Sequence, residues 1–264
     1  MNRGDPASDA AASLRDCLTE LAERGGTIIG EAVGGGPGPV ADWRHYPAGE
    51  VYDPVSHLQF FFHRHPVPAA DPVEYGHFHV FLRGEGMPAG AVPMLLPDMA
   101  VANAPSNINA ARQSAPLRRG HSDEVCHLVA IAVDPRGAPV RLFTTNRWVT
   151  GEAWYRAEDV IGALDRVRFG IAAAPALLCR WVEAVVALFR PEIAVLLRQR
   201  DQAITEWRWR WPRRNALEDA ALEITSTFAI DLEARLAAAE AGAARLMASP
   251  SPRPLPSMAE GWGA

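Results

Sequence analysis

Two segments decide the fold that this sequence predicts: LQFFFHRH, residues 58–65, and EYGHFHVFLRG, residues 74–84. In each, side chains of one kind recur at every second position, which is typical of a β-strand with two different faces. The apolar faces contain Leu58, Phe60 and Phe62 in the first segment and Phe78, Val80 and Leu82 in the second. The opposite faces carry two His-x-His pairs. If the two strands pair as a hairpin, four imidazoles converge on one small patch.

The rest of the chain predicts an α+β fold. Two further strands, VCHLVAIAV (125–133) and VRLFTTNRWV (140–149), are joined by the short turn DPRGAP. Helical spacing then dominates from residue 155 to 247, as expected when helices cover one face of an antiparallel sheet. We therefore expect about four to five strands within residues 43–150, packed against helices over 157–169, 175–189, 192–211 and 217–247.

The ends of the chain predict the domain organisation. Residues 8–24 have helical spacing, and the glycine-rich stretch that follows predicts a linker, so residues 1–40 are expected to be a helix plus linker. The stretch lacks the G-x-G-x-x-G spacing of a dinucleotide-binding loop. Residues 41–247 then form one domain. The tail 248–264, rich in Pro and Ser, is expected to be disordered.

Composition excludes several function classes. All 26 basic residues are arginine, which excludes a lysine-dependent phosphate loop and Schiff-base chemistry. The net charge of −5 disfavours a nucleic-acid partner. Three scattered cysteines, no secretory leader and no long apolar run predict a soluble cytoplasmic protein without a membrane partner. The Trp/Arg-rich segment at 207–211, taken alone, suggests a nucleic-acid or membrane surface. At helical spacing, however, Trp207 and Trp211 are expected to pack on the core and to leave the arginines in solvent.

The histidines predict a metal site. All eight lie between residues 45 and 127, and imidazole is a ligand for Fe, Zn, Cu or Ni. The candidate ligands are His63, His65, His77 and His79, with His127 on a third strand, where Val129 and Ile131 share its parity. The alternative is that these are ordinary structural histidines, hydrogen-bonded to their neighbours.

His77-Phe78-His79 followed by Glu85 resembles the first metal motif of cupins, in which His-x-His precedes a glutamate. Here five residues separate His79 from Glu85, whereas that family has three or four. The second cupin motif has no counterpart in this chain. The resemblance covers about ten residues and implies a metal ligand set, but it does not assign the family.

A second candidate site lies at the end of the fourth strand. Asn146, Arg147 and Trp148 combine an amide, a guanidinium and an indole, and Arg119 adds a cation from a long loop. Such a set suits a small anionic ligand; capping and ion pairing at a sheet corner are the alternative. We therefore expect a metalloenzyme acting on a small anionic substrate. The alternatives are a non-catalytic accessory protein and a metal- or haem-handling protein, and the Ala-rich final helix suggests a homodimer.

Overall fold

The computed structural model describes residues 5–35, 40–66, 74–94, 124–170, 173 and 175–248, with the side chains of 243–248 excepted. It places six strands in one antiparallel sheet, in the order in which they occur along the chain. The strands are β1 (Tyr46–Tyr52), β2 (Leu58–His63), β3 (Gly76–Arg83), β4 (Val125–Val133), β5 (Pro139–Thr145) and β6 (Ile224–Ala229). The α+β class is confirmed, with one strand more than expected.

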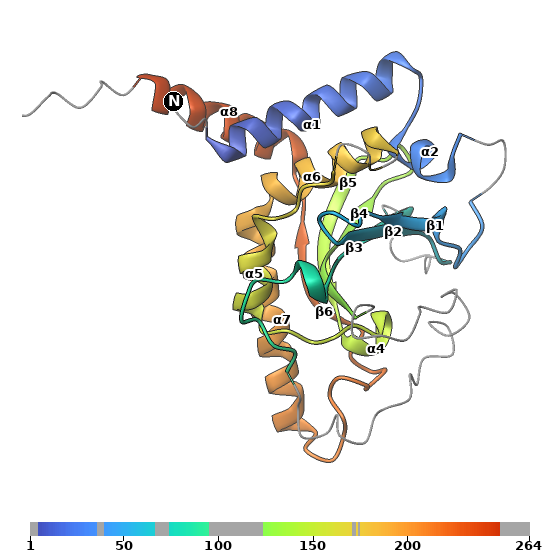
Figure 1. Ribbon diagram of the computed structural model, residues 1–264, viewed down its shortest axis with the longest axis vertical. Helices are drawn as coiled ribbons and strands as arrows, with labels where there is room; N and C mark the ends of the chain where they lie inside the picture. The colour runs from blue at the N-terminus through green and yellow to red at the C-terminus, as the bar shows by residue number, and fades with distance from the viewer. Residues whose placement is uncertain are drawn as a thin grey trace, which may run out of the picture.

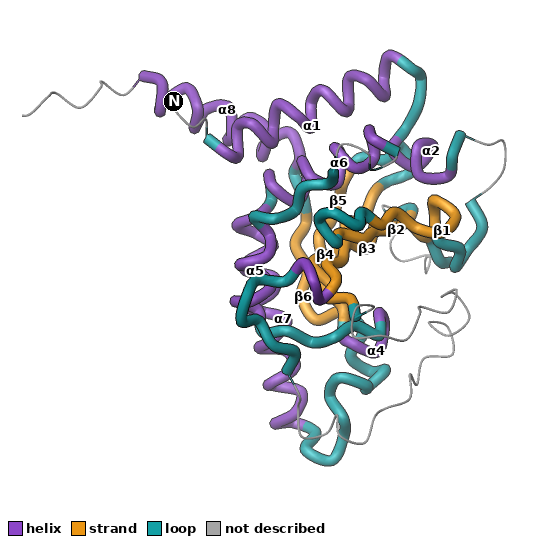
Figure 2. Tube along the Cα trace, in the orientation of Figure 1, coloured by secondary structure: helices purple, strands orange, loops and turns teal. Residues whose placement is uncertain are grey.

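Helices form a second layer on one side of the sheet (Figures 1 and 2). They are α1 (Pro6–Glu23), α2 (Ile28–Val33), α5 (Ala157–Leu164), α6 (Ala176–Leu188), α7 (Arg190–Arg210) and α8 (Leu232–Ala248). The one-turn helix α4 (Arg147–Thr150), which follows β5, lies apart from this layer in Figure 1, and a 3₁₀ turn lies at Gly84–Gly86. Among the described residues, no helix is both long enough and apolar enough to cross a membrane.

The main core lies between the sheet and these helices. Its sheet side consists of every second residue of the central strands, all of them fully buried: Leu58, Phe60, Phe62, Phe78, Val80, Leu82, Val129, Ile131, Val133 and Leu142. Trp181 of α6 is also fully buried, and its ring lies 5.1 Å from that of Phe78. Because neighbouring residues of a strand point to opposite faces, this packing leaves the histidines on the other face of the sheet.

The sixth strand corrects the sequence interpretation. Residues 224–229 fall inside the helix that was expected over 217–247, where the structure has β6 followed by α8. The segment Ile-Thr-Ser-Thr-Phe is rich in β-branched and aromatic residues, which favour strands. It pairs with β5, and the Thr144 hydroxyl lies 2.7 Å from that of Thr225 and 2.6 Å from that of Ser226.

The N-terminal region also differs from the expectation. Residues 28–33, predicted as part of a linker, form the short helix α2. The Thr27 hydroxyl caps it by accepting a hydrogen bond from the Gly30 N–H at 3.0 Å, and Gly34 ends it with φ of 80°. Helix α1 contributes Leu14 and Cys17 to the main core. Most of the segment 85–124 and the tail 249–264 lie outside the described residues.

Candidate metal centre

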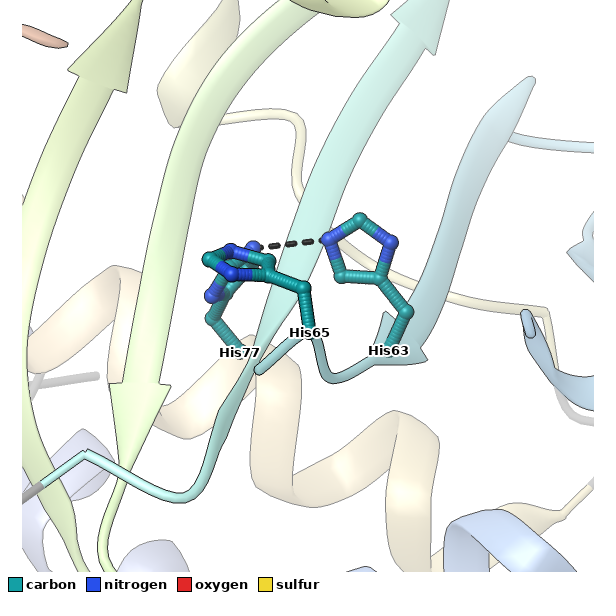
Figure 3. A group of neighbouring side chains, drawn as sticks. All are labelled: His63, His65 and His77. Atoms are coloured by element: carbon teal, nitrogen blue, oxygen red, sulfur yellow. Dashed lines mark hydrogen bonds between the residues drawn. The ribbon is translucent and has the colours of Figure 1, made fainter. Parts of the chain in front are cut away.

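The pairing of β2 with β3 brings His63 directly opposite His77. The two Nε2 atoms are 2.7 Å apart (Figure 3). His65 follows the end of β2, and its ring centroid lies 5.2 Å from that of His77 and 5.9 Å from that of His63. One ring nitrogen of each of the three histidines lies within 4.8 Å of the others, so this His63–His65–His77 group (the histidine triad) could hold a metal ion.

A carboxylate fixes the orientation of His77. Its Nδ1 lies 2.7 Å from Oε1 of Glu74, whose other oxygen forms an ion pair with Arg141. Glu74 lies two residues before β3, outside the strand, so its carboxylate reaches the imidazole of His77 without following the strand alternation. With Nδ1–H donating to Glu74, the Nε2 lone pair of His77 points toward His63. Histidines that bind metals in proteins are held by an outer carboxylate in the same way.

Burial favours the neutral imidazoles of His63 and His77. Desolvation lowers the pKa of His63 well below its usual value, and the neighbouring imidazoles lower it further. Desolvation also lowers the pKa of His77, although Glu74 opposes that shift. His63 Nδ1 is buried, and no described residue forms a hydrogen bond with it. Neutral imidazole is the form that binds a metal ion.

His79 and His127 form a second pair beside the histidine triad. His79 Nδ1 lies 3.1 Å from His127 Nε2, and His127 Nδ1 is 3.5 Å from the Thr145 hydroxyl. Both imidazoles are almost fully buried. The ring of His79 lies 5.1 Å from that of His63. The structure therefore brings three of the five predicted ligands into one group and places the other two in a hydrogen-bonded pair next to it.

A β-bulge explains how His127 reaches this face. Val80 pairs with Val129 but Phe81 pairs with His127, so Leu128 is an extra residue in β4. The bulge reverses the alternation, which places His127 on the histidine face while Val129 and Ile131 stay in the core. Simple parity in the sequence cannot show such an insertion.

The sequence interpretation missed the contribution of β1 and the residues before it. Trp43 stacks on His65, with ring centroids 5.0 Å apart. His45 stacks on Phe61 at 3.7 Å and its Nδ1 lies 2.7 Å from Glu50 Oε1. Trp43 and Glu50 both have positive φ, 65° and 61°, which is uncommon for residues other than glycine. Since the register between β1 and β2 shifts between Tyr46 and Val51, sequence spacing could not have placed these side chains.

The predicted anion-binding residues are engaged in structural contacts. Asn146 donates from Nδ2 to the carbonyls of Ala216 at 2.7 Å and Leu222 at 3.0 Å, and its Oδ1 accepts from the Arg147 N–H at 2.8 Å. Arg147 forms an ion pair with Glu218, and Trp148 Nε1 donates to the Leu222 carbonyl at 2.8 Å. These contacts hold α4 against residues 216–222. They favour the alternative in which Asn146, Arg147 and Trp148 cap and pair at a sheet corner rather than bind a ligand. Arg119 lies outside the described residues.

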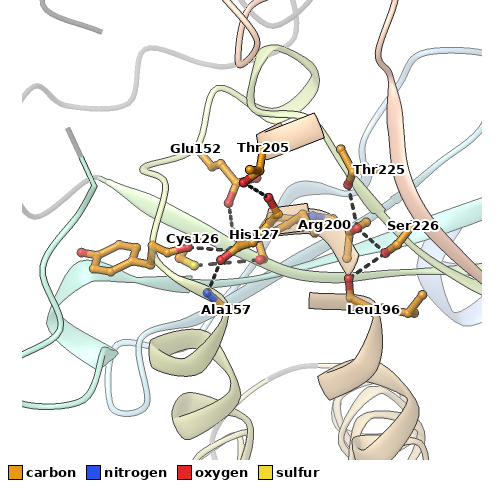
Figure 4. A network of polar contacts seen from close by, with 12 residues as sticks. Cys126, His127, Glu152, Ala157, Leu196, Arg200, Thr205, Thr225 and Ser226 are labelled. Atoms are coloured by element: carbon orange, nitrogen blue, oxygen red, sulfur yellow. Dashed lines mark hydrogen bonds and ion pairs between the residues drawn. The ribbon is translucent and has the colours of Figure 1, made fainter. Parts of the chain in front are cut away.

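A buried carboxyl group lies on the other side of His127. Glu152 accepts a hydrogen bond from the His127 backbone N–H at 2.8 Å (Figure 4). Desolvation raises the pKa of Glu152 from 4.5 to about 7, although Arg200 and the two hydrogen-bond donors, His127 N–H and Thr150, act in the opposite direction. Arg200 itself is buried, donates to the Tyr155 carbonyl at 2.6 Å and lies over the Trp154 ring.

Replacing Glu152 by glutamine is expected to remove a pH dependence of stability. The folded protein holds the Glu152 proton up to about pH 7, whereas the unfolded chain loses it near 4.5. The contribution of the protonated Glu152 carboxyl to the free energy of unfolding is therefore fully present below pH 4.5. It is lost as the pH rises through 7, which lowers the free energy of unfolding by about 3 kcal/mol. In urea unfolding, the free-energy difference between wild type and E152Q should fall by about that amount from pH 4.5 to 8.

E158Q is the matched control, because Glu158 is an exposed carboxylate that pairs with Arg198 at the surface. Its free-energy difference from wild type should stay nearly constant over the same range. If E152Q behaved like E158Q, the carboxyl of Glu152 would be ionised in the folded protein over this whole range, and burial would not raise its pKa.

Comparison with known proteins identifies the family of this chain but no activity. The model of a family described as a domain of unknown function (DUF6969) matches residues 8–230. That range contains all six strands and the histidine triad. No curated protein and no solved structure matches the chain.

Proposed function

We propose that this protein, which belongs to the DUF6969 family, binds one transition metal ion through His63, His65 and His77 and uses it as a metalloenzyme. One observation carries the proposal: His63 Nε2 and His77 Nε2 face each other at 2.7 Å while Glu74 engages Nδ1 of His77. At that separation the two nitrogens share a proton, and a small outward movement of the rings would let both bind one cation about 2.0–2.1 Å away. A third imidazole and an orienting carboxylate favour the cation.

The ligand set narrows the choice of metal. Three imidazole ligands suit Zn, Fe, Cu or Ni, and the triad contains no thiolate. Structural zinc sites are usually closed by four protein ligands, whereas catalytic sites have three and leave a position for water or substrate. A metal held by these three residues would activate water or bind a small anionic substrate directly. The protein would supply the fixed orientation of His77 and the buried surroundings of His63.

Metal titration of the untagged protein tests this proposal. After chelator treatment, the protein is expected to take up one Co²⁺, Zn²⁺, Ni²⁺ or Cu²⁺ per chain, with Co²⁺ giving the visible absorption of nitrogen ligation. H57N is the matched control: His57 lies outside the triad, contacts the Tyr52 hydroxyl at 3.3 Å and has φ of 63°, which asparagine tolerates. H57N should bind like wild type. Uptake below one ion in ten chains for all four metals would refute the proposal.

Replacing Glu74 by glutamine is expected to weaken metal binding about 10–100-fold, the usual effect of losing an outer-shell partner. Glutamine retains an acceptor for His77 Nδ1–H but loses the charge that makes the imidazole more basic. Competition with a chromogenic chelator measures the change. E50Q is the control, since Glu50 makes the same kind of contact to His45, outside the triad. Equal affinities for E74Q and E50Q would show that Glu74 does not act on the metal.

We also propose that the protein works in the cytoplasm. Cys17, Cys126 and Cys179 are all free thiols, as is usual for proteins of a reducing compartment. Burial raises the pKa of each of the three. A homodimer through the C-terminal helices remains a prediction.

A further inference from the structure

The C-terminal end of α7 carries an exposed group of tryptophan and arginine side chains. Trp207 packs with Trp154, Ile204 and Leu217 and donates from Nε1 to Asp219 at 3.0 Å. Trp209 is 87% exposed and Trp211 is 39% exposed, so packing on the core is confirmed for Trp207 only. Residues 209–214, Trp-Arg-Trp-Pro-Arg-Arg, are all exposed and are called the Trp–Arg tip below.

The tip projects from the molecule. In Figure 1 the lower end of α7 and the turn after it lie beyond the ends of the strands, at the bottom of the view. A side chain that is 87% exposed gains almost no free energy from burial in its own protein. Tryptophan has one of the largest apolar surfaces of any side chain, so leaving it in water forgoes a large burial free energy. An exposed tryptophan at a projecting helix end is therefore suited to an external partner.

The charge of the tip selects an anionic partner. Arg210, Arg213 and Arg214 lie within five residues, in a chain whose net charge is −5. Arg214 pairs with Asp219 at 3.1 Å, whereas Arg210 and Arg213 form no ion pair with any described residue. The local charge thus opposes the charge of the whole chain, as expected for a site that must approach an acidic surface.

Contrary to the expectation from composition that there is no membrane partner, we propose that the Trp–Arg tip docks on the surface of a bilayer containing anionic phospholipids. Tryptophan prefers the headgroup region, where its ring is partly apolar and its N–H stays hydrated, and each arginine near an anionic surface strengthens binding. Single-stranded nucleic acid is a poorer fit because it needs successive open aromatic faces. Here the guanidinium groups of Arg214 and Arg210 lie 4.9 and 5.7 Å from the ring centroid of Trp211, which leaves Trp209 as the one open ring of the tip.

Vesicle sedimentation with the full chain tests the proposal. We expect binding to vesicles of phosphatidylcholine mixed with phosphatidylglycerol, weak binding to phosphatidylcholine alone, and loss of binding as the salt concentration rises. R210A/R213A should lower the partition coefficient about 25-fold, since each arginine contributes about fivefold. W209A should also lower it severalfold. The exposure of all three side chains makes these variants compatible with folding, which circular dichroism checks.

R136A is the matched control, because the Arg136 side chain is 90% exposed on the turn between β4 and β5. It should bind vesicles like wild type. Equal binding to both kinds of vesicle, or an equal loss in R136A and R210A/R213A, would overturn the proposal. Binding of a single-stranded oligonucleotide that depends on Trp209, without binding to anionic vesicles, would overturn it in favour of a nucleic-acid partner.

Discussion

Replacing His77 by alanine is expected to abolish stoichiometric metal binding, with an affinity loss of more than 100-fold. The reason is that outer-shell changes alone cost 10–100-fold, and this substitution removes both the ligand and the group that Glu74 orients. H63A should have an effect of the same size, because His63 supplies the facing nitrogen at 2.7 Å. Competition titration with Co²⁺ or Zn²⁺ measures both.

H79A and H127A serve as matched controls on the same sheet face. Their imidazoles are hydrogen-bonded to each other at 3.1 Å and lie outside the triad, so these variants should keep metal affinity within about tenfold of wild type. Thermal unfolding of the metal-free proteins must first show that all four variants are folded. The assignment of the ligands would be contradicted if H79A and H127A lost metal binding while H63A and H77A retained it.

Replacing Phe78 by alanine is expected to cost about 3–5 kcal/mol of unfolding free energy, the usual range for a fully buried aromatic residue. Phe78 lies between His77 and His79 in sequence but points to the helical layer. Its ring contacts those of Phe62 and Trp181, with centroids 5.0 and 5.1 Å apart. The cavity left by alanine would lie at the centre of the sheet–helix interface.

Urea unfolding at neutral pH measures this change, and F78L is the control because leucine refills much of the space. F78L should cost clearly less than F78A. A loss below about 1 kcal/mol in F78A would mean that the core does not depend on the packing of β3 against α6. This pair of variants also separates the two faces of β3, since Phe78 packs in the core and His77, next to it in sequence, belongs to the histidine triad on the other face.

The sequence predicted the central part of the fold and of the site because both follow from strand alternation. LQFFFHRH and GHFHVFLR could pack one apolar face against the helices only by placing His63, His77 and His79 on the opposite face. An antiparallel hairpin then brings His63 next to His77. These inferences need only the two-residue alternation of a β-strand and the pairing of two strands that are close in sequence.

Other parts of the structure depend on contacts between distant segments. The bulge at Leu128 decides the face of His127, and β6 forms because the edge of β5 accepts a strand almost 80 residues later in the chain. Trp43 reaches His65 through the pairing of β1 with β2. The guanidinium of Arg147 could bind an anion, but it forms an ion pair with Glu218, which lies more than 70 residues later in the sequence. Composition shows none of these relations.

Anomalous diffraction from crystals of the metal-loaded, untagged protein tests the central claim most directly. We predict one anomalous peak per chain, about 2.0–2.2 Å from ring nitrogens of His63, His65 and His77, with Glu74 still bonded to His77 Nδ1. A metal-loaded crystal with no peak at the triad, or with a peak held by His79 and His127 instead, would contradict it.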